Sequence, residues 1–512
     1  MTEKIKSILR NRILVMDGAM GTMIQARELS DDDFGGAALE GCNENLNITR
    51  PDVIQSIHEI YFDAGSDIVE TNTFGGTGIV LAEYGLENKV LEINRRGAQI
   101  ARAAAEKFAT ADRPRFVAGS MGPTTKAITV TGGVTFDQLA NDFDMQARGL
   151  IEGGVDLLLL ETAQDTLNLK AGVLGILNAQ KVTGIAPPIM ISATIEPTGT
   201  MLAGQGVEAL YTALEHFPLL SIGLNCATGP EFMTDHIRAL SQMATCLVSV
   251  YPNAGLPNED GEYEETPEGL AEKLSRFVGE GWVNIIGGCC GTTPQHISEI
   301  AKMVSGRAPR IAKPTKKTTV SGIEYLQIED EMRPIIVGER TNVIGSRKFK
   351  RLIVEGKIEE GAEIGRAQVK TGAQIIDVCM ANPDRDEVAD IDVFIQELNK
   401  KVKAPIMIDS TDTEVTEIAL KHCQGKCIIN SINLEEGESR FEEIVPLLKK
   451  YGGAVVVGCI DEDPDQGMGV TRARKMEIAK RSYQLLTEKY GIAPEDIIFD
   501  PLVFPVGKGD EN

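Results

Sequence analysis

One short segment, residues 155–162, reads Val155-Asp156-Leu157-Leu158-Leu159-Leu160-Glu161-Thr162. A continuous apolar run of this length is typical of a strand that is covered on both faces, as strands of parallel sheets are. The run ends in a carboxylate, which an apolar interior would not accept unpaired. The segment therefore predicts a buried parallel strand that carries Glu161 at its carboxyl end.

The same kind of run recurs through the first 300 residues and alternates with helix-like stretches such as 51–64 and 92–108. Eight runs are found, at 13–18, 67–74, 115–120, 155–162, 189–195, 220–225, 246–253 and 283–290. A closed barrel consists of eight such strand and helix units, in roughly 250–300 residues. We therefore expect residues 1–305 to form a (β/α)8 TIM-type barrel of the α/β class.

A basic, proline-bearing stretch follows, and we interpret residues 306–333 as an interdomain linker. The strand pattern then restarts at 335–340, 373–380, 404–410, 426–432, 454–461 and 497–504. Six strands are fewer than the eight of a complete barrel. We expect residues 334–512 to form a second TIM-type barrel that is truncated after about six strands, as in a piece of a longer protein, with two unpaired sheet edges.

Composition narrows the class of protein. The 512 residues are 42% hydrophobic and 25% charged, and no apolar run approaches membrane-spanning length, which favours a cytoplasmic protein without a membrane partner. The formal net charge of -24 argues against nucleic acid as a partner. Nine cysteines at irregular spacing indicate reduced thiols with metal or packing roles rather than a disulfide framework.

Three cysteines stand out because they follow two apolar runs, in Gly223-Leu224-Asn225-Cys226 and Gly287-Gly288-Cys289-Cys290. Adjacent cysteines form a strained disulfide, whereas one metal ion accepts both sulfurs together with a third from another strand. Thiolate-rich tetrahedral sites select zinc, and three protein ligands leave the fourth position for a substrate. A closed structural zinc site is the alternative, but such sites favour Cys-x-x-Cys pairs on small loops.

The polar residues at the ends of the runs should meet at the carboxyl-terminal face of the barrel, where such barrels perform chemistry. These residues are Asp17, Asn72, Thr73, Ser120, Glu161, Glu196, Cys226, Asn253, Cys289 and Cys290. Asp17 and Glu161 suit the ammonium group of an amino acid, and the hydroxyl and backbone amides around Ser120 suit its carboxylate. A thiol bound to thiolate-ligated zinc stays nucleophilic, so this set of residues favours alkyl transfer to sulfur.

These segments, together with Asp17-Gly18-Ala19-Met20-Gly21-Thr22 and Glu70-Thr71-Asn72-Thr73-Phe74, resemble the zinc-dependent homocysteine S-methyltransferase domain over residues 1–305. The resemblance implies that Cys226, Cys289 and Cys290 bind zinc and carry the catalysis. It also implies that Asp17, Asn72, Ser120 and Glu161 form the homocysteine site. Asn253 matches an asparagine that fills the fourth zinc position in relatives, although a plain turn residue is an equal alternative.

In the second domain, polar residues again follow apolar strands, and we expect them to form a hydrogen-bonding pocket for a polar organic ring. These residues are Glu339, Asn342, Asp377, Asp409, Asn430, Asp461 and Asp500. The pattern resembles the pterin-binding domain of corrinoid-dependent methyltransferases, which implies that the first five bind 5-methyltetrahydrofolate. Basic residues offset the acidic surface for the folate tail, namely Arg340, Arg347, Lys348, Lys350 and Arg351. One departure is Cys379, where relatives carry asparagine, and Asn382 is a candidate to compensate.

The order of the two segments resembles the N-terminal half of the cobalamin-dependent methionine synthase family. That resemblance implies a methyltransferase that moves a methyl group from methyltetrahydrofolate through cobalamin to zinc-activated homocysteine, giving methionine and tetrahydrofolate. The cobalamin-binding signature Asp-x-His-x-x-Gly surrounds none of the five histidines, which are His58, His216, His236, His296 and His422. We therefore expect the cobalamin to be carried by a module not present in this chain, either downstream or on a separate chain.

Two alternatives remain open. The first is direct methylation of homocysteine from betaine or S-methylmethionine without cobalt, but such an enzyme has no need of a pterin pocket. The second is a non-catalytic scaffold that docks a corrinoid protein. Convergent polar residues at one face of each barrel argue against a purely structural role.

Overall fold

The computed structural model describes residues 2–259, 261–313 and 316–503. The chain divides into two compact units, Met1–Tyr211 with Pro218–Pro314 and Thr212–Phe217 with Thr315–Asn512. The residues at 504–512, which include the end of the expected strand 497–504 and of the expected second domain, lie outside the described part. No helix in the described ranges combines the length and hydropathy needed to cross a membrane.

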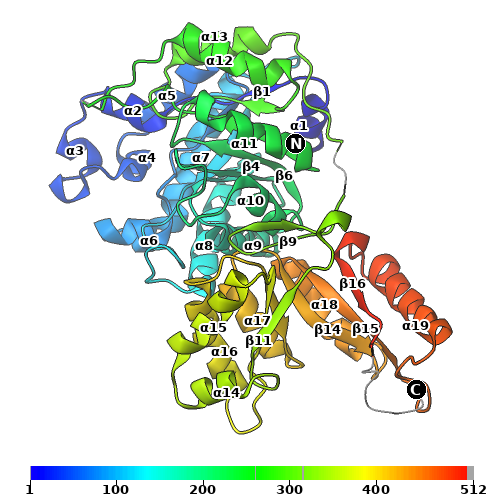
Figure 1. Ribbon diagram of the computed structural model, residues 1–512. Helices are drawn as coiled ribbons and strands as arrows, with labels where there is room; N and C mark the ends of the chain where they lie inside the picture. Colours follow the sequence, from blue (N-terminus) through cyan, green and yellow to red (C-terminus); the bar gives the residue numbers. More distant parts are fainter. Residues whose placement is uncertain (1, 260, 314–315, 504–512) are drawn as a thin grey trace. The chain divides into compact units, whose positions relative to one another are not determined.

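The first unit contains an eight-stranded parallel sheet (Figure 1). Its strands are β1 (Leu14–Val15), β2 (Ile68–Glu70), β3 (Phe116–Met121), β4 (Leu157–Ala163), β5 (Ile189–Ala193), β6 (Leu219–Asn225), β7 (Leu247–Tyr251) and β8 (Ile285–Ile286). Neighbouring strands pair in chain order, and β1 also pairs with β8. A parallel bridge between Met16 and Ile68 joins β1 to β2 and closes the ring. The predicted (β/α)8 barrel is thus confirmed.

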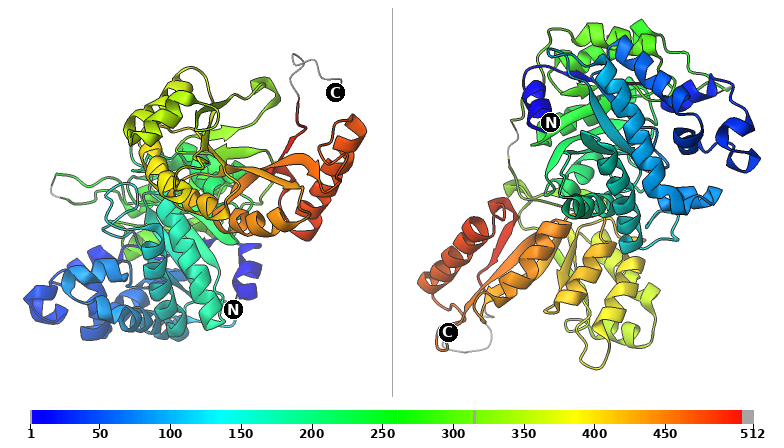
Figure 2. Two further views of the ribbon diagram at one scale, coloured as in Figure 1. Left: turned by 90° about the horizontal axis from the view of Figure 1, so that it is seen from below. Right: turned by 180° about the vertical axis from the view of Figure 1, so that it is seen from behind.

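The main helices of this unit lie outside the ring, as both views in Figure 2 show. They are α1 (Thr2–Leu9), α2 (Met20–Gln25), α3 (Asp31–Phe34), α4 (Leu46–Thr49), α5 (Pro51–Ala64), α6 (Gly78–Leu81), α7 (Val90–Phe108), α8 (Phe136–Gly153), α9 (Thr166–Thr183), α10 (Val207–Leu214), α11 (Pro230–Met243), α12 (Pro267–Gly279) and α13 (Pro294–Val304). Short 3₁₀ turns are η1 (Ala37–Leu39), η2 (Asn43–Asn45), η3 (Ala82–Tyr84) and η4 (Glu87–Lys89).

Local sequence explains where these helices begin and end. Helix α5 begins at Pro51, whose missing N–H is not needed in the first turn, and is followed by Gly65 in the left-handed region at φ 119°. Helix α8 begins after Thr135, which forms a capping box with Gln138. Such signals fix the helix bounds and so the points at which each strand returns to the barrel.

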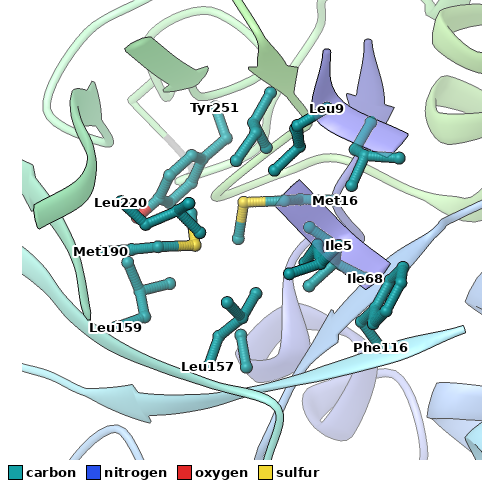
Figure 3. Packing of buried hydrophobic residues seen from close by; sticks show 13 residues of the cluster. Ile5, Leu9, Met16, Ile68, Phe116, Leu157, Leu159, Met190, Leu220 and Tyr251 are labelled. Carbon is teal, nitrogen blue, oxygen red and sulfur yellow. The ribbon is translucent and has the colours of Figure 1, made fainter. Parts of the chain in front are cut away.

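The interior of the barrel is filled by side chains from alternate strand positions (Figure 3). Leu157 and Leu159 of β4 lie in this cluster, whereas Leu160 packs outward against Gly172 of α9. Ile5 and Leu9 of helix α1 join the same cluster. A strand with both faces buried explains the unbroken apolar run at 157–160.

The second unit contains a six-stranded parallel sheet in the order of the chain. Its strands are β11 (Val337–Asn342), β12 (Ile375–Cys379), β13 (Ile406–Asp409), β14 (Cys427–Leu434), β15 (Gly453–Asp461) and β16 (Ile497–Asp500). The described residues of β11 and β16 do not pair with each other, so both edges stay open. The number and direction of these strands agree with the six predicted from the sequence.

The helices of the second unit connect these strands. They are α14 (Arg347–Val354), α15 (Ile358–Lys370), α16 (Glu387–Asn399), α17 (Thr413–His422), α18 (Ser439–Tyr451) and α19 (Arg472–Gln484), with short turns η5 (Asp330–Met332), η6 (Leu485–Lys489) and η7 (Pro494–Asp496). A small antiparallel hairpin, β9 (Thr319–Ser321) and β10 (Tyr325–Gln327), lies within the stretch expected as a linker. Val320 of this hairpin belongs to the same buried cluster as Ile375 and Ile428.

Candidate functional site

Three cysteines meet at the carboxyl-terminal end of the first barrel. Cys226 directly follows β6, and Cys289 and Cys290 lie three and four residues beyond β8. Their sulfur atoms all lie within 4.8 Å of one another. The Sγ atoms of Cys226 and Cys290 are 3.7 Å apart. The structure therefore brings together the three residues that the sequence analysis selected as metal ligands.

The backbone after β6 turns sharply to present Cys226. Cys226 and Ala227 both have left-handed conformations, with φ values of 57° and 56°, which residues with a side chain rarely adopt. The Thr228 N–H donates to the Cys226 carbonyl at 2.6 Å, and the Asn253 N–H donates to the Thr228 carbonyl at 3.3 Å. These bonds hold a strained turn, which is a feature that clusters at functional sites.

The end of β7 holds the other two cysteines in place. The Cys289 N–H donates to the Pro252 carbonyl at 2.8 Å, and the Ala254 N–H donates to the Cys290 carbonyl at 2.9 Å. The side-chain oxygen of Asn253 accepts a hydrogen bond from the Cys290 N–H at 3.1 Å. Asn253 thus contacts the cysteine loop directly, and its role as a fourth metal ligand stays a prediction.

Asn225 is a residue of this site that the sequence analysis did not select. Its Oδ1 accepts hydrogen bonds from the Ser192 hydroxyl at 2.6 Å and from the Thr162 N–H at 3.1 Å. Its Nδ2 donates to the Thr162 hydroxyl at 2.8 Å and lies 3.9 Å from the sulfur of Cys289. Asn225 therefore connects the ends of β4, β5 and β6 to one of the thiols. Its place directly before Cys226 at the end of a strand was the available signal.

A cavity of about 350 Å³ opens beside the three sulfurs. It is lined by residues from the loops after several strands, and the polar ones are Thr22, Gln25, Asn43, Glu44, Glu70, Thr71, Asn72, Ser120, Glu161, Thr162, Cys226, Cys289 and Cys290. All four sequence-predicted substrate residues lie at or next to it, since Asp17 contacts the lining residue Glu70. Glu196, another expected strand-end residue, is not part of this lining.

Four carboxyl groups lie at or next to this cavity, those of Asp17, Glu44, Glu70 and Glu161. The sequence analysis quoted Glu70 only within a motif and did not select Glu44. Asp17 is 2% exposed, and its Oδ2 accepts the Glu70 N–H at 3.0 Å. The other oxygen of Asp17, Oδ1, is buried without a hydrogen-bond partner among the described residues. Ser120 donates its hydroxyl to Oε1 of Glu161. An unpartnered buried carboxylate oxygen indicates a place for a donor that the protein itself does not supply.

Burial dominates the acidity of this cluster. Loss of solvent raises the pKa of Asp17 and of Glu70 well above their ordinary values, and the charge of Glu161 adds to both shifts. Burial also raises the pKa of Glu161 to about 7, with a further contribution from Cys226 and an opposing one from the Ser120 hydroxyl. Carboxyl groups that cannot all ionise together favour a bound cation.

The three thiols are also unequal. Hydrogen bonds from Cys226 and Cys289 lower the pKa of Cys290 to about 3, whereas the contact with Cys226 raises the pKa of Cys289 well above its ordinary value. One thiolate is therefore stabilised by its two neighbours. A second or third thiolate requires a positive charge beside the sulfurs.

A second polar cluster occupies the same end of the sheet in the second unit. Asn342 donates its side-chain amide to Oδ2 of Asp377 at 3.1 Å and to Oδ2 of Asp409 at 3.2 Å. Its own Oδ1 accepts the N–H groups of Ile344 and Gly345, both at 2.9 Å. Three of the predicted pterin residues thus converge from β11, β12 and β13.

The other two predicted pterin residues lie beside this cluster. Asn430 of β14 is the register partner of Asp409 in β13, and the charge of exposed Glu339 acts on both aspartates. Burial raises the pKa of Asp377 to about 7, and the nearby Asp409 adds to the shift. The structure brings all five residues to one edge of the sheet.

Cys379 is 2% exposed and lies beside Asn342 in the sheet register. Asn382, which we expected to compensate for it, is buried, and its backbone N–H donates to the Met380 carbonyl at 2.7 Å. Ser410 and Glu387, which the sequence analysis did not select, hydrogen bond to each other at 2.8 Å. Asp461 is paired instead with Arg474, at 2.5 Å.

A closed barrel with thiols and carboxyl groups at the carboxyl ends of its strands defines a barrel enzyme of the α/β class. Residues 14–304 match the family model of homocysteine S-methyltransferases, and the chain belongs to that family. It is a methyltransferase. Residues 338–512 match the model of pterin-binding enzymes. This pairing is consistent with the N-terminal modules of methionine synthases, and it supports homocysteine methylation with a folate-type donor.

Among solved structures, the chain is similar to the homocysteine methyltransferase MmuM of Escherichia coli. The metallated form has 22% sequence identity and a TM-score of 0.48, with 58% of this chain and 98% of that chain covered. The oxidized form has 22% identity and a TM-score of 0.47, with 57% and 95% covered.

Proposed function

We propose that this protein transfers a methyl group from 5-methyltetrahydrofolate, by way of a cobalamin carried outside these 512 residues, to the thiolate of homocysteine held at a zinc site. The products are methionine and tetrahydrofolate. The observation that carries the proposal is the group of three cysteine sulfurs beside a cavity at which the carboxyl groups of Asp17, Glu70 and Glu161 meet.

The geometry of the sulfurs fits a zinc ion. Tetrahedral zinc with bonds of about 2.3 Å to sulfur separates its thiolate ligands by about 3.8 Å. The Cys226 and Cys290 sulfurs are 3.7 Å apart. Zinc bound by these three cysteines would stabilise the thiolate form of a substrate thiol at neutral pH. Three protein ligands leave a fourth position for that thiol.

The carboxyl groups supply recognition of the amino-acid end of the substrate. The buried, unpartnered Oδ1 of Asp17 suits an ammonium donor. Glu161 lines the cavity and accepts a hydrogen bond from the hydroxyl of Ser120, on a neighbouring strand. A bound ammonium group would let Asp17, Glu70 and Glu161 ionise by offsetting their mutual repulsion. These residues would thereby orient homocysteine with its sulfur toward the cysteines.

The second unit supplies the site for the methyl donor. The carboxyl groups of Asp377 and Asp409, with the amides of Asn342 and Asn430, match the adjacent N–H donors and the ring acceptors of a pterin. Asp377 holds a proton up to about pH 7, so this group changes from donor to acceptor close to neutrality. We propose that these residues, with Glu339, orient the pterin for methyl transfer.

The cavity of the first barrel also bears on the alternative donors. Quaternary ammonium groups such as that of betaine are recognised by cages of several aromatic rings. Among the described residues, Phe74 is the single aromatic side chain that lines the cavity. This composition favours the cobalamin route over direct methylation from betaine.

Zinc content and proton release test the proposal together. Wild-type protein should bind one zinc per chain and release a proton when homocysteine is added at neutral pH, and Cys290→Ala should do neither. Methylcobalamin should then serve as a methyl donor, whereas betaine and S-methylmethionine should not. Zinc without proton release would contradict thiol activation and would favour a scaffold. Activity with betaine or S-methylmethionine would contradict the proposed donor route through 5-methyltetrahydrofolate and cobalamin.

A further inference from the structure

The first unit has a second cavity, at the end of the barrel opposite to the three cysteines. Its volume is about 360 Å³, comparable with the 350 Å³ of the cavity beside the sulfurs. Ile189, Leu219 and Leu247, the first residues of β5, β6 and β7, all line it. Small-molecule sites are usually clefts of roughly 300–1,000 Å³, so this cavity has the size of a ligand site.

Much of the lining of this second cavity is apolar and rigid. Leu9 of α1 and Leu220 of β6 line it and also belong to the buried cluster in Figure 3. Pro188 directly precedes β5 and Pro218 directly precedes β6, and both line the cavity. Because the ring of proline fixes its φ angle, these two segments keep their shape without a ligand. The cavity therefore offers a preformed apolar surface.

The charged residues of this lining are both basic. Lys6 lies in α1 and Arg10 directly follows it, at the four-residue spacing of neighbours on one helix face. Among the described residues, no aspartate or glutamate lines the cavity, although the chain holds 75 acidic and 51 basic residues. Lys6 has a single 3.9 Å contact with exposed Glu3, and Arg10 has no ion pair within the described ranges. Two like charges at this spacing repel each other, and a bound anion would remove that repulsion.

We propose that this second cavity binds a small amphipathic anion, in which a carboxylate or phosphate group is joined to a compact apolar body. Lys6 and Arg10 hold the anionic group through charge-assisted hydrogen bonds, and the leucine and proline side chains cover the apolar body. A neutral apolar ligand would leave the two cations without a counter-charge, and a small inorganic anion would leave the apolar surface uncovered. The site goes beyond the proposed function and does not depend on it, because it lies at the other end of the barrel.

The test measures the binding of octanoate, a carboxylate on a heptyl chain, to the full chain by isothermal titration calorimetry. Octanamide has the same chain without the charge, and acetate has the charge without the chain. Octyl phosphate distinguishes a phosphate ester from a carboxylate as the preferred anion, and tighter binding of either one supports the site.

Cys246 reports where octanoate binds. It lines the cavity and is partly exposed, so a ligand in the cavity should slow its alkylation by iodoacetamide. Burial raises the pKa of the Cys246 thiol to about 11, so the reaction is followed at pH 9, by mass spectrometry of the peptide.

Three variants separate the charges from the apolar lining. Lys6→Gln combined with Arg10→Gln removes both charges. Lys4→Gln, at an exposed residue of α1 that is not part of the lining, is the matched control. Ala186→Trp keeps both charges and places a large ring at an exposed position of the lining.

Octanoate should bind wild-type protein at one site per chain and protect Cys246. Its affinity should fall about tenfold in the double variant, and octanamide and acetate should bind about tenfold more weakly than octanoate to wild type. Lys4→Gln should resemble wild type, and Ala186→Trp should lose binding. No octanoate binding to wild type, unchanged affinity in the double variant, or binding without protection of Cys246 would each overturn the inference. Zinc content and proton release should be the same in all these variants, so the inference and the proposed function can fail separately.

Discussion

The first unit closes its eight strands into a ring, whereas the second keeps six strands with open edges at β11 and β16 among the described residues. Both place their polar clusters at the carboxyl ends of parallel strands, yet the chemistry of the clusters differs. The first gathers three thiols and four carboxyl groups, and the second gathers two aspartates around the amide of Asn342. The same sheet edge thus supports two kinds of recognition.

The difference shows how buried charge decides the ligand. In the first unit, the clustered acidic groups cannot all be ionised unless a cation is bound beside them. Such a cluster suits a metal ion and an ammonium group. In the second unit, amide donors offset the aspartates and leave hydrogen-bonding capacity for a neutral ring. The predictions below are arranged to separate these two sites, from the largest expected effect to the smallest.

The largest difference between the two sites should be produced by Cys290→Ala. Loss of one of three ligands should reduce zinc content from one per chain to nearly none, and methyl transfer to homocysteine should fall by about 1,000-fold or more. Metal analysis and product formation measure the two effects, and pterin binding by the second unit should be unchanged. Cys246→Ala, at a cysteine of the same barrel outside the cluster, is the control. Retention of stoichiometric zinc in Cys290→Ala would contradict the ligand assignment.

Asp377→Asn should change the second unit alone. The pKa of Asp377 is raised from an ordinary 3.8 to about 7, so the folded state binds the proton more tightly than the unfolded chain does. Stability should therefore fall as pH rises from about 4 to about 7, and the neutral asparagine should recover roughly 2–4 kcal/mol at pH 8. Denaturant unfolding at pH 5 and pH 8 measures the gain. A variant that is less stable than wild type at pH 8 would contradict this account.

Glu161→Gln should weaken substrate recognition while sparing the metal. Methionine carries the same ammonium group as homocysteine but has no thiol, so its affinity reports the carboxyl groups separately. Because the pKa of Glu161 is about 7, methionine should bind about tenfold more tightly at pH 8 than at pH 6 in wild type. Glu161→Gln should bind weakly at both values and keep its zinc. Glu196→Gln, at a strand-end residue away from the cavity, serves as the control.

The smallest effect should come from Asn225→Ala. This change removes a hydrogen bond near the Cys289 sulfur and leaves the buried Ser192 hydroxyl without its acceptor. Zinc affinity should fall by about tenfold and the fold should lose about 1–3 kcal/mol. Competition with a chelator and thermal unfolding measure the two losses. Wild-type zinc affinity in the variant would show that Asn225 supports the strands but not the metal site.

The strands could be predicted from the sequence because each is a short apolar run with both faces covered, as at Leu157–Leu160. The hairpin β9–β10 could not, since its short segments show no apolar run of that kind. The three cysteines were visible because two are adjacent and all follow strands. Glu70 was not, because its place beside Asp17 depends on how β1 and β2 meet where the ring closes.

The closure of the ring has a thermodynamic consequence. Strand β1 is two residues long, and it meets β2 through the Met16–Ile68 bridge, the Asp67 N–H bonded to Val15 at 2.7 Å, and the Glu70 N–H bonded to Asp17 at 3.0 Å. A cation held between Asp17 and Glu70 would add one more interaction between β1 and β2, where the ring closes. Ligand binding and barrel closure would then be thermodynamically linked, so bound substrate would stabilise the folded barrel.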